Sequence, residues 1–103
     1  MMSEPSTIWL EGRIVEEDSG FTLSGLCRAT GASESQVVLW VSEGAFGEQD
    51  GAQQTWRFTG TSLYRARVAV RLASDFDINP PGIALALDLL DEIDALRARV
   101  TRS

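Results

Sequence analysis

The chain has 103 residues, 44% of them hydrophobic, which suits one domain with a modest core. Its 15 acidic residues outnumber 9 basic residues, all Arg, and the net charge of −6 disfavours binding to nucleic acid and favours basic protein partners. A single cysteine, Cys27, and the absence of histidine exclude an internal disulfide, a Cys/His zinc site and His-based catalysis.

The sequence also lacks signals for membranes and for catalysis. No apolar run approaches the roughly 18 residues that span a membrane, and residues 1–7 do not follow the order of a signal peptide. We therefore expect a cytoplasmic protein. There is no paired nucleophile and base, no Gly-rich phosphate loop and no metal-ligand spacing. We expect no enzyme activity, no catalytic or metal-binding residue and no cofactor.

The N-terminal part of the chain predicts a short strand. Residues 8–15 are rich in β-branched and aromatic residues and partly alternate, which is typical of an edge strand. Acidic residues and Gly20 end it. We treat residues 1–20 as an N-terminal segment with this strand, and residues 21–103 as one helix-turn-helix domain.

Two short helices follow. Thr22 can cap the first, Gly31 can end it in the left-handed conformation, and Gly44 can end the second. Ser33 and Gln36 have the spacing of a capping box at the start of the second helix. Two helices joined by a Gly-containing turn indicate a helix-turn-helix. Cys27 falls on the apolar stripe of the first helix, so we interpret it as a small core residue rather than a reactive thiol.

The middle of the chain predicts a wing and a third helix. A polar loop, residues 47–54, leads to a short β-prone stretch, residues 55–58, which the N-terminal strand could pair with. This order is that of a winged helix-turn-helix. A helix is then expected over residues 59–76, and it carries the only basic cluster in the middle of the chain: Arg65, Arg67 and Arg71.

The last stretch predicts one long helix. Asn79 can cap it and Pro81 suits an early helical position. A helix from there to Arg102 would be about 33 Å long at about 1.5 Å per residue. Its apolar stripe is wider than one small domain needs to cover, which predicts a homodimer. The residues expected to mediate self-association are Ile83, Leu87, Leu90, Ile93, Leu96 and Val100.

Five motifs follow one another along the chain: LCRATGAS (26–33), VSEGA (41–45), WRF (56–58), AVRL (69–72) and, most distinctively, PGIALALDLLDEI (81–93). Together they resemble those of one family, the CbpM chaperone modulators. The match runs in order from residue 21 to residue 100. The resemblance implies a mainly α, MerR-like winged helix-turn-helix with short β elements, the N-terminal strand and the wing, and a long C-terminal helix.

The resemblance also implies a function. A CbpM-like protein binds the J-domain of CbpA, a DnaJ-like co-chaperone, and blocks its productive contact with the Hsp70 chaperone DnaK. Within the family, binding also opposes the DNA binding of CbpA. The implied partner is therefore a CbpA-type J-domain, and direct nucleic-acid binding is not expected.

The acidic charge suggests where such a partner would bind. J-domains present a basic helix to Hsp70, and no basic residue occurs from residue 29 to residue 56. We hypothesise that acidic side chains steer the partner and that Trp40 or Phe46 is an apolar anchor. Two roles stay open for Trp40, the anchor and an ordinary core residue. The acidic residues are Glu34, Glu43, Glu48 and Asp50.

A second function class stays open. A MerR-type transcription regulator would need a basic surface for phosphates. The candidates for that surface are Arg57 and the Arg65, Arg67 and Arg71 cluster.

Overall fold

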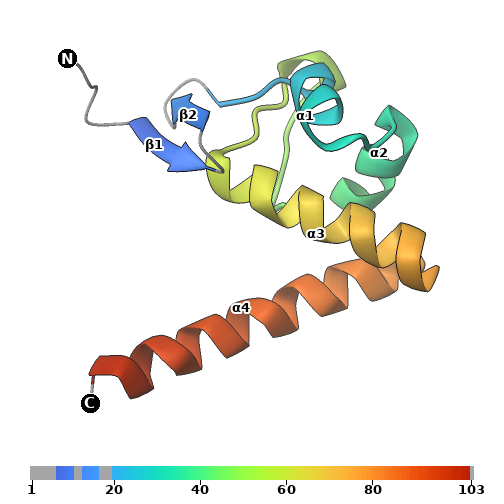
Figure 1. Cartoon of the computed structure of the whole chain (residues 1–103). Helices are drawn as coiled ribbons and strands as arrows, with labels where there is room; N and C mark the ends of the chain where they lie inside the picture. The colour runs from blue at the N-terminus through green and yellow to red at the C-terminus, as the bar shows by residue number, and fades with distance from the viewer. Residues whose placement is uncertain (1–6, 11–12, 17–19, 103) are drawn as a thin grey trace.

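A computed structural model describes residues 7–10, 13–16 and 20–102. These residues form a mainly α fold (Figure 1). Helices α1 (Leu23–Thr30) and α2 (Glu34–Ser42) make the helix-turn-helix, and α3 (Gly60–Phe76) and α4 (Pro80–Arg102) complete the helical part. A single 3-10 turn, η1 (Gln53–Thr55), interrupts the loop between α2 and α3.

Local capping interactions set the helix boundaries where the sequence predicts them. The Thr22 side chain accepts a hydrogen bond from the Gly25 N–H at 3.0 Å. The Ser33 Oγ accepts from the Gln36 N–H at 3.1 Å, and the Gln36 side chain accepts from the Ser33 N–H at 3.0 Å, which completes the capping box. Gly31 ends α1 with φ 85°. The two short helices and their turn are confirmed.

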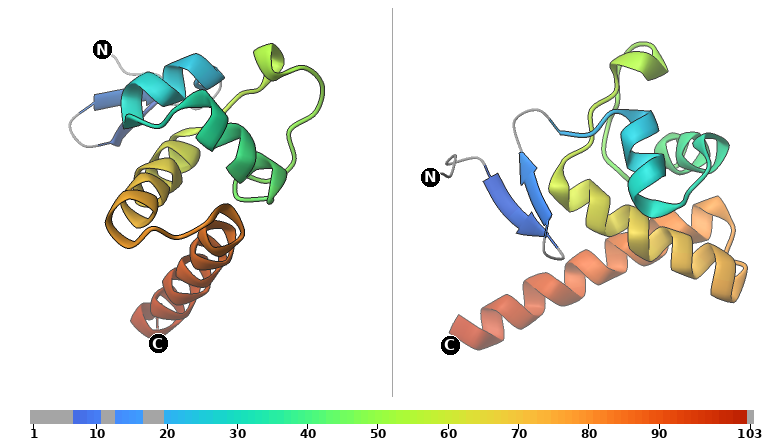
Figure 2. Two further views of the ribbon diagram at one scale, coloured as in Figure 1. Left: turned by 90° about the vertical axis from the view of Figure 1, so that its right-hand side faces the viewer. Right: turned by 45° about the horizontal axis from the view of Figure 1, so that its top comes forward.

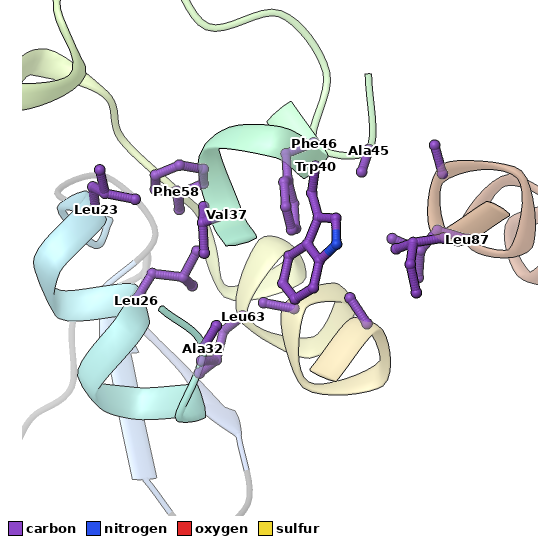
Figure 3. Packing of buried hydrophobic residues seen from close by; sticks show 14 of the residues in the cluster. Leu23, Leu26, Ala32, Val37, Trp40, Ala45, Phe46, Phe58, Leu63 and Leu87 are labelled. Atoms are coloured by element: carbon purple, nitrogen blue, oxygen red, sulfur yellow. The ribbon is translucent and has the colours of Figure 1, made fainter. Parts of the chain in front are cut away.

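One hydrophobic core joins all four helices (Figure 3). Trp40 of α2 lies at its centre, and Leu63 of α3 and Leu87 of α4 lie around it (Figure 3). Phe58 packs edge-on against Phe46, with ring centroids 5.7 Å apart and an interplanar angle of 85°. The loop from α2 to α3 therefore contributes aromatic side chains to the core rather than only connecting helices.

The β elements differ from the expected ones. Instead of one strand over residues 8–15, two short strands, β1 (Thr7–Leu10) and β2 (Arg13–Glu16), pair antiparallel with each other. The described strands are four residues each, and the prediction did not foresee that residues 7–10 would pair back on residues 13–16. Residues 1–6, 11–12 and 17–19 of the predicted N-terminal segment lie outside the described residues.

The expected wing is reduced to one bridge. Phe21 and Phe58 exchange two backbone hydrogen bonds, of 2.6 and 2.8 Å, and in the described ranges no strand forms over residues 55–58. The reason is local. Phe58 and Trp56 are buried, and Thr59 already caps α3, so the chain turns into the helix directly after one paired residue. The bridge ties the start of the domain to the segment before α3.

The long helix α4 has two different halves. Its first part packs against α2 and α3, where Ile83, Ala84 and Leu87 are buried. The Asn79 side chain caps it by accepting from the Gly82 N–H at 2.8 Å. Every residue from 88 to 101, the outer half of α4, is exposed, and after the contacts of Asp88 and Asp91 with Arg65 this half extends away from the other helices (Figures 1 and 2). None of the described helices, α4 included, is long and apolar enough to cross a membrane.

Candidate protein-interaction site

Helix α2 presents its polar face to solvent because two of its apolar side chains face the core. Val37 and Trp40, three residues apart, are buried. Glu34 and Glu43 are both exposed; nine residues apart, they are separated by about 13 Å along the helix axis and by about half a turn around it. The exposed surface of α2 therefore carries separated carboxylates together with the apolar side chain of Leu39.

The four predicted acidic residues are all exposed, and they lie at two ends of α2. Glu48 and Asp50 line a shallow recess of about 600 Å³ with Val41 and Ser42, at the C-terminal end of α2. Glu34 lies at the other end, in a recess of about 320 Å³ that the start of α1 and Gln53 also line. The structure brings Glu48 and Asp50 together and keeps Glu34 apart from them.

Two predicted anchors are not surface residues. Trp40 is 2% exposed and Phe46 is 9% exposed, and both belong to the core cluster. Since an anchor must reach the partner, the anchor hypothesis is wrong for both side chains, and Trp40 takes the core role that the sequence left open.

The exposed apolar residue of α2 is Leu39, which is 52% exposed and was not among the predicted contact residues. The sequence of α2 gave no clear signal for Leu39, because residues 37–41 are all apolar and do not mark which face is buried.

The basic cluster on α3 is partly used inside the protein. Arg65 donates from Nε and Nη2 to the Ala45 carbonyl, at 3.0 and 2.7 Å, and from Nη1 to the Asp91 carboxylate. Its side chain is 13% exposed. Arg57 donates to its neighbouring Trp56 carbonyl at 2.9 Å. Arg65, at least, is therefore a structural residue rather than part of an open basic surface.

Cys27 is half-buried on α1. Burial raises the pKa of its thiol, and the negative charge of Glu34 raises that pKa further. Among the residues that the structure describes, no three Cys, Asp or Glu side chains come together as ligands for a metal ion.

The outer half of α4 carries exposed apolar side chains. Of the residues expected to mediate self-association, Ile83 is fully buried and Leu87 is 2% exposed, so the prediction is wrong for these two. They face α2 and α3, because the first turns of α4 cover the core. Four others remain on the surface with Leu85 and Leu89: Leu90, Ile93, Leu96 and Val100.

Comparison with known proteins places the chain in a family. The family described as MerR HTH family regulatory protein matches residues 21–102. The chaperone modulatory protein CbpM of Coxiella burnetii (strain Dugway 5J108-111) is 32% identical over 91 residues, which are 88% of this chain and 86% of that protein. CbpM of Escherichia coli O139:H28 (strain E24377A / ETEC) is 34% identical over 77 residues, 75% of this chain and 76% of that protein.

These matches define a regulatory protein with a MerR-type helix-turn-helix. More particularly, the chain belongs to the CbpM family of chaperone modulatory proteins, as its motifs indicated. These relatives are named as modulatory proteins, and none of these names describes an enzyme.

Proposed function

We propose that this protein binds the J-domain of a CbpA-type, DnaJ-like co-chaperone and inhibits its co-chaperone and DNA-binding activities. The observation that carries the proposal is the acidic exposed surface of α2 and its following loop, on a chain whose relatives are chaperone modulators. A J-domain presents a basic helix, and complementary charge steers such partners together.

The acidic surface of α2 also argues against sequence-specific DNA binding. A recognition helix contacts base edges with Arg, Lys, Asn or Gln, and phosphates attract basic residues. Between Arg28 and Arg57 the chain has no basic residue, so α2 and both of its flanking loops lack the charge that nucleic acid requires. An acidic helix-turn-helix is better suited to a basic protein.

The transcription regulator is the second candidate, because the matching family is described as regulatory. It would have to use Arg57 and the α3 cluster, of which Arg65 already binds Ala45 and Asp91. A mobility-shift assay at low salt against mixed duplex DNA tests this candidate. We expect no shift at micromolar protein, and a shift that is lost on changing Arg67 and Arg71 to Ala would favour the regulator instead.

The J-domain proposal is tested by titrating the purified protein with a CbpA J-domain in a calorimeter. A parallel assay measures how far the protein suppresses J-domain stimulation of the DnaK ATPase. Binding together with suppression is the expected result. No detectable heat and no suppression at a hundred micromolar, with a folded J-domain, would overturn the proposal.

Charge-reversal variants distinguish the effect of the acidic surface on association from the effect of the protein's net charge. The combined variant Glu34→Lys, Glu43→Lys and Asp50→Lys should slow association about tenfold or more at low salt. The control, Asp75→Lys, reverses one exposed charge on α3, away from this surface and from α4, and it is compared with the single variant Glu48→Lys, which changes the net charge equally. Equal association rates for these two single variants would remove the assigned surface while leaving the J-domain proposal standing.

We further propose that a second copy of the chain covers the outer half of α4. The acidic residues of this half, Asp88 to Asp94, precede Arg97 and Arg99 along the helix. In an antiparallel pair, the Arg end of one copy would lie opposite the acidic part of the other, so the helix is complementary to itself. The exposed leucines and Val100 would then be buried between the two copies.

A further inference from the structure

A groove lies between α2 and the turn that joins α3 to α4. It has a volume of about 480 Å³ and is lined by residues of α2, of the end of α3 and of the start of α4. Figure 2 shows α2 alongside the first turns of α4, which places these segments next to one another. The four residues Glu34, Glu43, Glu48 and Asp50 are not among those that line it.

Apolar side chains line both sides of the groove. Leu39, 52% exposed, lies on the α2 side, and Ile78 and Pro80 line the opposite side. Trp40 also lines the groove but is only 2% exposed, so Leu39 offers most of the apolar surface on the α2 side. An exposed leucine in a groove with apolar sides is suited to burying one or two apolar side chains of a partner.

Negative charge lies in the groove and beside it. Asp77 lines the groove at the C-terminus of α3, and Glu43, outside the lining, follows Leu39 by one turn at the C-terminus of α2. Helix C-termini carry partial negative charge, and neither helix has a basic residue in its last turn. The dipoles and the carboxylates therefore add, and they favour a cation beside Leu39.

Asp77 ends α3 with φ 56°, in the left-handed region that Gly adopts most readily and that Asn and Asp adopt more often than other residues. Its carboxylate opposes the dipole of α3, so this charge does not stabilise the helix. The side chain is exposed and therefore accessible to a cationic group of a partner.

We propose that this groove binds a basic amphipathic helix of the partner. Leu39 contacts its apolar side chains, and Asp77 and Glu43 pair with Lys or Arg on its flanks. The identity of the partner as a J-domain rests on the proposed function, whereas the groove and its chemistry do not. Leu39 thus takes the anchoring role that Trp40 and Phe46, buried in the core, cannot have.

Nuclear magnetic resonance of the full-length, ¹⁵N-labelled protein tests the groove. Two probes are used: the CbpA J-domain, and a synthetic Lys/Leu amphipathic helical peptide with a Glu/Leu peptide as its control. We expect both basic probes to shift the amide signals of Leu39 and Ile78, and the acidic peptide to leave them unchanged.

Matched variants make the test quantitative. Leu39→Ser should weaken binding of the J-domain about tenfold or more, as loss of a central anchor does. Tyr64→Ser is its control, because Tyr64 is 52% exposed on α3, away from the groove and from the exposed part of α4. Asp77→Asn keeps the left-handed position and should slow association several-fold at low salt, with the difference disappearing as salt rises.

The outcomes separate this proposal from the proposed function. If the J-domain binds and Leu39→Ser binds as tightly as Tyr64→Ser, the groove is overturned and the J-domain function stands. If the Lys/Leu peptide shifts the groove signals and the J-domain does not bind, the groove stands and the J-domain function fails. If neither basic probe shifts Leu39 or Ile78, the groove is overturned. Thermal unfolding of each variant confirms that it is folded.

Discussion

The guanidinium of Arg65 in α3 bonds the carboxylate of Asp91 in α4 while it also holds the Ala45 carbonyl of the loop after α2. Asp88 adds a longer contact to the same guanidinium, at 3.8 Å. One arginine therefore joins three separate parts of the chain. It meets α4 just where that helix leaves the core, so it fixes the direction in which the exposed half extends.

Removing this arginine should cost stability. Arg65→Ala leaves the carbonyl of the buried Ala45 without its charged donors, and we expect unfolding free energy to fall by about 2–3 kcal/mol. Asp91→Asn should cost less than about 1 kcal/mol, because the Asp91 side chain is 62% exposed. Urea unfolding followed by circular dichroism measures both. Arg71→Ala, exposed on the same helix, is the control, and an Arg65→Ala cost no larger than the control's would contradict this role.

Trp40 should behave as a core residue and not as a binding anchor. Trp40→Ala removes a 2% exposed indole from the centre of the cluster and should destabilise the fold by about 3–5 kcal/mol. Trp40→Phe should retain the fold and bind the J-domain with nearly the affinity of the original protein. Urea unfolding and calorimetry measure the two effects separately. A folded Trp40→Phe protein with binding reduced more than tenfold would return Trp40 to the interface.

The sequence predicts the helices well because their signals are local. A cap such as Thr22 or Ser33 needs only the next three residues, and both side chains make the expected bonds. The burial of one face of a helix depends instead on segments far away in the chain. Trp40 is buried by α3 and α4, so its environment could not be read from α2 alone.

The same distinction explains the errors in α4 and in the β elements. Ile83 and Leu90 belong to one apolar stripe in the sequence, yet the core covers Ile83 and ends before Leu90, which is 37% exposed. Periodicity gives the stripe but not the point where the neighbouring helices stop. Similarly, the prediction of β structure at Phe58 was correct for that residue alone. Because Phe58 is buried and α3 begins directly after it, this segment forms only one bridge, with Phe21.

Two glycines with positive φ should respond differently to alanine. Gly31 has φ 85°, and a Cβ at this position would meet only open space, so Gly31→Ala should cost about 1 kcal/mol from backbone strain alone. Gly20 has φ 66°, and a Cβ there would lie 2.7 Å from the Phe58 carbonyl oxygen. Gly20→Ala should therefore cost more than Gly31→Ala, because it also disturbs the Phe21–Phe58 bridge. Equal costs in urea unfolding would show that the bridge is not important for stability.

The thiol of Cys27 should react slowly. Burial and the charge of Glu34 raise its pKa, so less thiolate is present at pH 8 than for a free cysteine. We expect alkylation by iodoacetamide at pH 8 to be several-fold slower than for glutathione. Glu34→Gln removes the smaller cause, lowers the pKa and should speed alkylation modestly, whereas Glu43→Gln should not. Alkylation as fast as that of glutathione would contradict the interpretation of Cys27 as a core residue.

Self-association should depend on the outer half of α4. We expect sedimentation equilibrium to give twice the 11.2 kDa mass of one chain. Leu96 and Val100 are 54% and 74% exposed, and burying a carboxylate at either position in an apolar interface is unfavourable. The variant Leu96→Asp with Val100→Asp should weaken the dimer about 100-fold or more.

The control for self-association adds the same charge to the helix-turn-helix part. Leu39→Asp with Tyr64→Asp changes two side chains that are each 52% exposed and lie on α2 and α3. This control should remain dimeric, because the antiparallel arrangement buries only α4. A monomeric original protein, or a dimer that Leu96→Asp with Val100→Asp leaves intact, would exclude α4 as the dimer interface. Dissociation of the control alone would place the interface on the surface of α2 or α3 instead.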